Sequence, residues 1–220
     1  MGALLNDPDS NTEFTKAHNY ISDFRAIVQA LGGRYEAELV DLAIKEYESA
    51  LFALAMGNYR GAFSGLRLAF EMNLAAIYFS AHEIDYRLWL VKAKDINWAV
   101  LVSSDNGVFS AAFANAFRSE LNDERLHYQN LALTVYRECS EYVHGNAHTH
   151  GILPAGVEYS KEVVSAWCEK ASTIQLIIIF AFALRYIQQL GRPALNQVES
   201  VMLENLGHLA PVQLVYQVAA

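Results

Sequence analysis

The chain has 220 residues, of which 53% are hydrophobic and 18% charged, and its net charge at pH 7 is −8. This length suits one compact domain or a domain with a tail, and the apolar content excludes disorder over most of the chain. A negative charge without any long basic run argues against a protein that coats DNA or bulk RNA. It leaves room for a protein that contacts a few phosphates through one or two arginines.

The cellular compartment follows from the cysteines and the apolar segments. Cys139 and Cys168 are too few and too isolated for a disulfide framework or a zinc knuckle, which favours a reducing cytoplasm. Residues 1–14 are polar and acidic and do not resemble a signal peptide. The most apolar run, residues 173–184, is shorter than the ~20 residues that span a bilayer. We therefore expect a cytoplasmic protein without membrane contact, with this run in a core helix.

Helical periodicity covers the N-terminal part of the chain. Ser10 and Glu13 have the spacing of a capping box, which predicts the start of a first helix. Glycines at the expected helix ends separate three long segments. The predicted helices cover about residues 12–31, 34–56 and 59–80.

The rest of the chain continues the helical pattern with interruptions. Short helical pieces around Trp89 and Trp98 are expected within residues 84–118, and residues 103–107 have the composition of a turn. Beyond them we predict a helix over 123–144, a loop over 146–156, a helix over 160–190 and one more helix with a loose end over 194–220.

These elements predict the fold class. No convincing alternation of apolar and polar residues indicates a strand, and no internal repeat is present. Long helices joined by short loops indicate an all-α bundle of antiparallel helices. We expect residues 1–190 to form one helical domain and residues 191–220 to form a C-terminal helix or tail.

The helix over 123–144 carries two polar side chains with a spacing that suggests chemistry. Arg137 and His144 are seven residues apart, two helical turns, and therefore project in nearly the same direction. Their direction is opposite the apolar face that must pack on the bundle. That face comprises Tyr128, Leu131, Val135, Tyr136, Cys139, Tyr142 and Val143.

An arginine and a histidine on one face suit the cleavage of RNA by its own 2′-hydroxyl. The reaction needs a base, an acid and positive charge beside the phosphate in the transition state. Histidine transfers protons near neutral pH, and arginine grips phosphate oxygens. One chain supplies half of such a site, and a two-fold dimer supplies the whole. The alternative is that Arg137 and His144 are ordinary solvent-exposed residues of a long helix.

Two segments resemble the HEPN (higher eukaryotes and prokaryotes nucleotide-binding) family. Residues 136–146, YRECSEYVHGN, resemble the Y-R-x-x-S-x-Y-V-H-G ending of HEPN helices, whose pattern is Arg, four to six residues, then His. Residues 66–71, LRLAFE, resemble the L-R-x-x-x-E segment upstream in some members. The part of the chain that the resemblance covers, including the helices around these two segments, is about residues 58–187. The family often has Asn after its arginine, where this chain has Glu138.

The resemblance implies a HEPN-like bundle and a metal-independent ribonuclease without a cofactor. Such enzymes leave a 2′,3′-cyclic phosphate and commonly serve toxin–antitoxin, abortive-infection or other antiphage systems. In this chain Arg137 would hold the phosphate and His144 would transfer protons, in a homodimer that acts on RNA. Ser140 or Glu141 would position His144.

The resemblance equally allows a module without catalytic activity, because some family members serve only in binding. Such a module would assemble with a partner protein or an antitoxin. The C-terminal segment 191–220 is the candidate docking segment, because it carries the apolar residues Val212, Leu214, Val215 and Tyr216.

Arg67 and Glu71 are four residues apart and meet on one helix face, with Arg67 among apolar residues. They form either a buried ion pair that fixes helix packing or a support that orients the helix of Arg137 and His144. Tyr142 is expected to pack in the core while hydrogen-bonding across helices.

Two further observations leave alternatives open. Arg185 lies in an almost wholly apolar helix, which favours a core arginine paired with a carboxylate over a phosphate contact. His144, His148 and His150 are spaced so that they could ligate a metal, but no recognisable ligand set completes the group, and we expect no metal.

Overall fold

The computed structural model describes residues 2–144 and 146–217, and every regular element in this part of the chain is a helix. The predicted all-α class is therefore confirmed. The helices are α1 (Gly2–Asn6), α2 (Pro8–Leu31), α3 (Glu36–Ala55), α4 (Tyr59–Phe79), α5 (Glu83–Leu90), α6 (Trp98–Leu101), α7 (Ala111–Phe117), the 3₁₀ helix η1 (Ser119–Leu121), α8 (Arg125–Val143), α9 (Ala147–Ile152), α10 (Lys161–Tyr186), α11 (Arg192–Leu206) and α12 (Ala210–Gln217).

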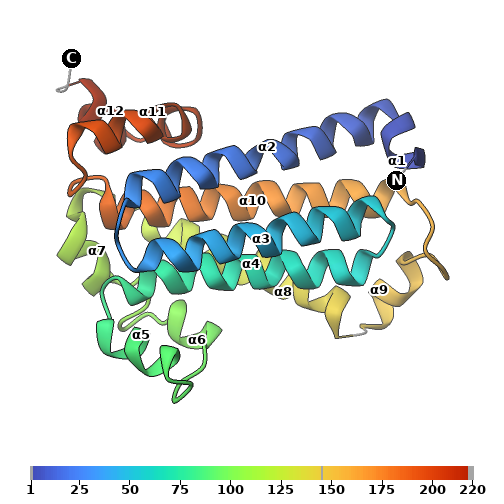
Figure 1. The fold of residues 1–220 in the computed structure, drawn as a ribbon, viewed down its shortest axis with the longest axis horizontal. Helices are drawn as coiled ribbons and strands as arrows, with labels where there is room; N and C mark the ends of the chain where they lie inside the picture. Colours follow the sequence, from blue (N-terminus) through green and yellow to red (C-terminus); the bar gives the residue numbers. More distant parts are fainter. Residues whose placement is uncertain (1, 145, 218–220) are drawn as a thin grey trace.

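Five long helices form the bundle: α2, α3, α4, α8 and α10 (Figure 1). Helices α2, α3 and α4 are antiparallel to their neighbours in sequence, because short turns join them, as predicted. Gly57 makes the second turn possible, since its φ of +77° is a conformation that side chains with a Cβ rarely adopt. Helix α4 lies against α3, α8 and α10, so it is the shared wall of the bundle.

Helix α10 is the core of the molecule. It is the one helix among the described residues that is long and apolar enough to cross a membrane, but 72% of its most apolar window is buried inside the fold. Trp167, Phe180 and Phe182 on this helix are almost completely buried. Neighbouring helices cover it on several sides, and this covering explains its near-continuous apolar sequence. The prediction of a core helix is confirmed.

The N-terminal start of the bundle differs from the prediction. Helix α2 begins at Pro8, and its N-cap is Asp7, whose carboxylate accepts a hydrogen bond from the Ser10 backbone N–H at 2.9 Å. The predicted capping box is therefore wrong. Ser10 is instead buried, and its hydroxyl lies 2.8 Å from the Tyr159 hydroxyl. Contacts far along the chain thus determine the role of this serine.

The C-terminal part contains more helix than predicted. The loop expected over 146–156 includes the short helix α9, where Thr149 donates a hydrogen bond to the Glu141 backbone oxygen at 3.0 Å. The described part of the C-terminal segment, residues 191–217, contains two helices, and α11 packs on α2 and α10. In α12, Val212 is buried while Leu214 is exposed.

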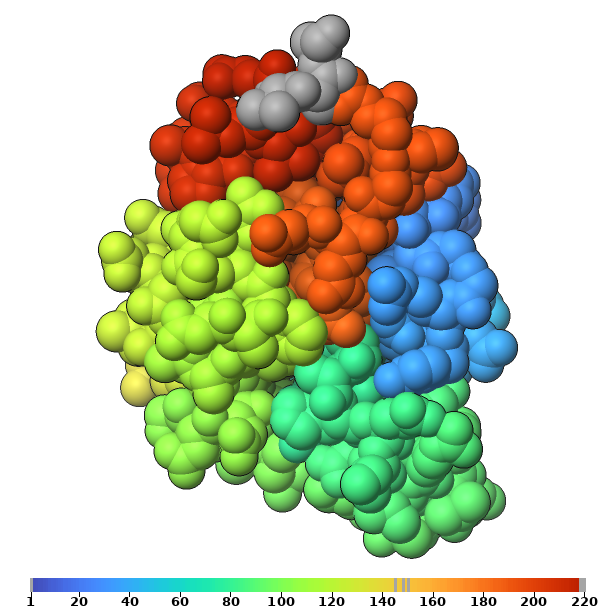
Figure 2. Space-filling model, turned by 90° about the vertical axis from the view of Figure 1, so that its left-hand side faces the viewer, coloured from blue at the N-terminus to red at the C-terminus, as the bar shows by residue number. Residues whose placement is uncertain are grey.

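Arg185 lies at the end of the bundle where α10 finishes. Figure 2 looks onto this end, with the chain around the C-terminal end of α10 in orange between α7 in light green and the α2–α3 turn in blue. The guanidinium donates to the Ser80 side chain and backbone and to Gln189, and it covers the Phe117 ring at 4.0 Å. Arg185 is thus a core arginine, but the predicted carboxylate partner is wrong, because neutral oxygens accept its hydrogen bonds.

Candidate functional site

Arg67 on α4 joins that helix to the C-terminal end of α8. Its Nη1 lies 3.3 Å from the Ser140 hydroxyl and 3.3 Å from Nε2 of His144. Ser140 in turn donates to the Tyr136 backbone oxygen at 2.8 Å, which holds its hydroxyl on the side of α8 that faces α4. The fold therefore brings together four residues singled out in the sequence, namely Arg67, Glu71, Ser140 and His144.

The hydrogen-bonding role of His144 in its contact with Arg67 depends on the tautomer of the imidazole. A guanidinium has only donors, so a hydrogen bond from Nη1 needs the lone pair of Nε2. The imidazole is then neutral, with its proton on Nδ1. In that tautomer the single lone pair of the exposed imidazole is occupied by Arg67, so the ring can accept a proton only when this hydrogen bond opens.

Glu71 and Tyr136 both contact the Arg67 guanidinium. Arg67 Nε is 3.4 Å from a Glu71 carboxylate oxygen, which is ion-pair distance, although the Nε–H itself makes no hydrogen bond. The guanidinium also lies 5.4 Å from the centre of the Tyr136 ring. Burial, together with a hydrogen bond to Glu71, raises the pKa of Tyr136 to about 12, so this phenol stays neutral. Trp98 stacks on the same ring at 3.9 Å. These contacts hold the arginine in one place.

Arg137 projects away from this group of residues. It is exposed, and within the described residues it forms no hydrogen bond or ion pair. The opposite face of α8 is packed, and Tyr128, Val135 and Cys139 are buried there. Arg137 thus lies outward on the same helix as His144, free to meet a ligand or another chain.

The two glutamates of α8 play different parts from those suggested by the sequence. The Glu138 carboxylate pairs with Lys170 of α10 at 2.8 Å, so its charge is compensated on the side away from α4. Glu141 contributes its backbone oxygen to Thr149, and its carboxylate has no contact with His144 in the part of the chain that the structure describes. Ser140, through Arg67, is therefore the neighbour that supports His144.

Arg60 is a site residue that the sequence analysis missed. Its Nη1 donates to the Tyr142 backbone oxygen at 3.2 Å, so a second arginine from α4 lies against the end of α8. The half-buried Tyr142 ring stacks on Phe63 at 3.7 Å and packs against the core as predicted, and burial raises its pKa. The predicted hydrogen bond of its hydroxyl across helices is absent among the described residues. The spacing of seven residues between Arg60 and Arg67 was the available signal, because it places both on one helix face.

The metal-site alternative involves the two histidines that follow α8. The side chains of His148 and His150 lie outside the described residues, so their distances to His144 are not part of the structure described. Among the side chains that the structure does describe, no three His, Cys, Asp or Glu groups lie close enough to hold a metal ion.

The arrangement offers a surface imidazole in contact with one fixed arginine, while a second, exposed arginine lies elsewhere on α8. Arg67 is held by its neighbours, whereas Arg137 is exposed. Such a group can bind a phosphate diester and move a proton at it. No protein-family model, curated protein or solved structure matches this chain.

Proposed function

We propose that this protein is a HEPN-like, metal-independent endoribonuclease of the toxin or antiphage-defence type. The observation that carries the proposal is the 3.3 Å contact between Arg67 Nη1 and His144 Nε2, at the motif that resembles the family's catalytic ending. In this tautomer Nε2 carries the only basic lone pair, so it takes the proton of a 2′-hydroxyl when Arg67 releases it and turns to the substrate phosphate. Attack of that oxygen on the adjacent phosphorus expels the 5′-oxygen and leaves a 2′,3′-cyclic phosphate.

Each residue has a distinct part in this reaction. His144 takes the proton of the 2′-hydroxyl, while Arg137 contacts the non-bridging phosphate oxygens, whose negative charge grows in the transition state. Arg67 is a positioning residue, because it is held by Glu71 and Ser140 and in turn holds His144. A guanidinium remains charged throughout and exchanges no proton with the substrate.

The leaving 5′-oxygen needs an acid, and one described chain places one imidazole beside Arg67. A second copy supplies the other. The outward stripe of α8 supports a dimer, because its residues follow spacings of three and four, as in helices that pair. Exposed leucines lie in that stripe beside the polar groups. Its members Leu126, Asn130, Leu133 and Arg137 are exposed, and the spacing continues to Ser140 and His144, which turn to Arg67 of α4.

The second candidate is a binding module without catalytic activity that assembles with a partner protein. One observation favours it: Arg137 makes no contact with His144 or Arg67 within the described chain, so a monomer holds only half of the groups that cleavage needs. The oligomeric state separates the two candidates. Sedimentation equilibrium giving a dimer favours the nuclease, and a strict monomer favours the module.

The test is cleavage of total RNA in the presence of EDTA. The nuclease predicts RNA fragments with 2′,3′-cyclic phosphate ends, no cleavage of DNA, and loss of cleavage in His144→Ala. His18→Ala is the control, because His18 is also exposed but lies on α2. Equal cleavage by wild type and His144→Ala would remove His144 from the mechanism.

A further inference from the structure

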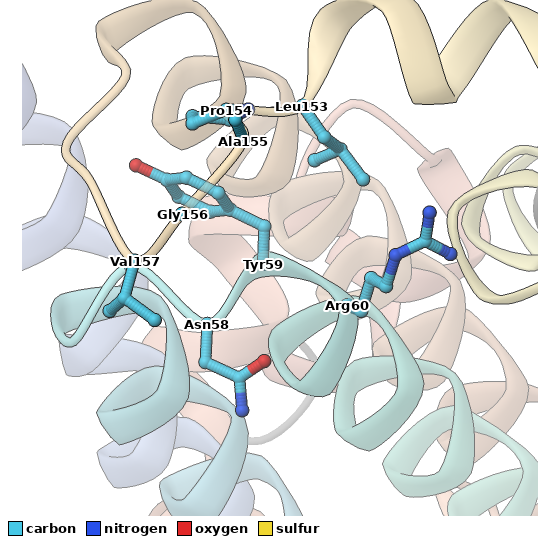
Figure 3. Close-up of a pocket in the computed structure, with 9 residues that line it drawn as sticks. Asn58, Tyr59, Arg60, Leu153, Pro154, Ala155, Gly156 and Val157 are labelled. Atoms are coloured by element: carbon cyan, nitrogen blue, oxygen red, sulfur yellow. The ribbon is translucent and has the colours of Figure 1, made fainter.

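A surface hollow of about 440 Å³ lies beside the end of α8. It is lined by residues 57–60, where α3 turns into α4, and by residues 153–157, which follow α9 (Figure 3). Two contacts hold its walls together. The Tyr59 hydroxyl accepts a hydrogen bond from the Ser160 backbone N–H at 2.6 Å. A Cβ at Gly57 would lie only 3.1 Å from the Glu158 backbone oxygen, so glycine permits the close approach of the two segments.

The lining of the hollow suits an anion. Its lining residues include Arg60 and no carboxylate, and the nearby Glu158 carboxylate lies 3.8 Å from where a Cβ at Gly156 would stand. The backbone adds further donors. Ala155, Gly156 and Val157 donate no backbone hydrogen bond within the described residues, so their N–H groups remain for a ligand. Consecutive amides of this kind bind phosphate oxygens and carbonyl groups.

The same walls also provide apolar surface. Leu153, Pro154 and Val157 face the hollow from the segment after α9, and Val157 is 73% exposed. A nucleobase needs one apolar contact surface for its face and a few polar groups for its edge. The hollow offers both in a volume that suits one nucleotide.

The hollow connects directly to the candidate site. Arg60 lines it and also binds the Tyr142 backbone oxygen, two residues before His144. Arg60 and Arg67 are two helical turns apart on one face of α4, which is about 10 Å along the axis. Arg60 thus joins the hollow to the end of α8 that carries His144.

We propose that this hollow is a nucleotide subsite, which binds the base and phosphate of a single-stranded RNA residue next to the scissile bond. The proposal rests on the proposed ribonuclease function, which it deepens by naming single-stranded RNA as the substrate class. A base must be unstacked from its neighbours to enter the hollow, and double-stranded RNA does not present such a base.

Charge substitutions at Val157 test the subsite by direct binding. Val157→Glu places a carboxylate in the hollow and Val157→Lys an ammonium group, so nucleoside 3′-monophosphates should bind at least fivefold more weakly and more tightly, respectively. The same changes at Val91 are the control, because Val91 is 71% exposed at the end of α5. Ala155→Trp, which fills the hollow, should weaken nucleotide binding without any new charge. Calorimetric titration measures the affinities.

Inorganic phosphate and uncharged nucleosides are titrated in parallel to identify what is recognised. Nucleotides binding more tightly than either component supports the subsite. Phosphate binding as tightly as the nucleotides would overturn it in favour of a plain anion site. Identical nucleotide affinities in wild type, Val157→Glu and Ala155→Trp would overturn it completely.

Cleavage assays separate this proposal from the ribonuclease itself. If wild type cleaves RNA, Val157→Glu should raise KM for a short oligoribonucleotide at least fivefold, while Val91→Glu leaves it unchanged. Cleavage with an unaltered KM in Val157→Glu would refute the subsite and leave the nuclease standing. Nucleotide binding that depends on Val157, in a protein that cleaves no RNA, would support the subsite as a binding site and refute the nuclease.

Discussion

Removal of the Glu71 carboxylate tests how Arg67 is held. The Arg67 and Glu71 side chains are only 23% and 17% exposed, so Glu71→Ala leaves a mostly buried guanidinium without its counter-charge. It also removes the acceptor of the Tyr136 hydrogen bond. Breaking a buried ion pair from one side costs about 3–5 kcal/mol. The remaining exposure and the 3.4 Å separation weaken the pair, so we expect a loss of about 2–3 kcal/mol.

The assay is thermal unfolding followed by circular dichroism. For a chain of this size, the expected loss lowers Tm by about 5–10 °C. Glu83→Ala is the control, because Glu83 and Arg87 form an exposed i,i+4 pair of the reverse order, with exposures of 57% and 74%. Its expected cost is within about 0.5 kcal/mol. If Glu71→Ala and Glu83→Ala lower Tm equally, the Arg67–Glu71 pair does not stabilise the fold at the site.

Three other outcomes follow from burial. The pKa of Tyr136 is raised to about 12 by burial, so folding stability is full below about pH 10 and falls as pH rises toward 12; Tyr136→Phe should flatten that fall in urea midpoints. Burial raises the pKa of Cys139 and of Cys168 to about 12, so neither thiol should react with a disulfide reagent at about pH 8 until urea is added. Phe180→Ala should cost about 3–5 kcal/mol in urea unfolding, whereas Ile84→Ala, at 76% exposed, should cost under about 0.5.

The long helices were predictable because their information is local. Apolar periodicity and the glycines at Gly32 and Gly57 define α2, α3 and α4 within a few residues. Helix α9 was not predictable in this way, because six residues form no stable helix alone. Its stability comes from contacts such as the Thr149 hydrogen bond to Glu141 on α8.

The candidate site was predictable only in part. The sequence pairs Arg67 with Glu71, because this relation lies within one helix. It predicts a common outward direction for Arg137 and His144, whereas His144, the C-cap of α8, contacts Arg67 of α4 and Arg137 projects away from that contact. The contact between Arg67 and His144 joins positions 77 residues apart, so it depends on how α4 packs against α8. For the same reason the sequence could not assign Glu138 to Lys170 or Arg60 to the end of α8.

The most direct test of the central claim is the rate at which wild type and His144→Ala cleave one oligoribonucleotide in EDTA. Loss of a positioned acid–base group lowers such a rate by about 10²–10⁴-fold. We predict a fall of at least about 100-fold for His144→Ala, with His18→Ala unchanged and the wild-type product ending in a 2′,3′-cyclic phosphate. Equal rates for wild type and His144→Ala, or no cleavage by either protein, would contradict the assignment of the Arg67–His144 pair to a ribonuclease site.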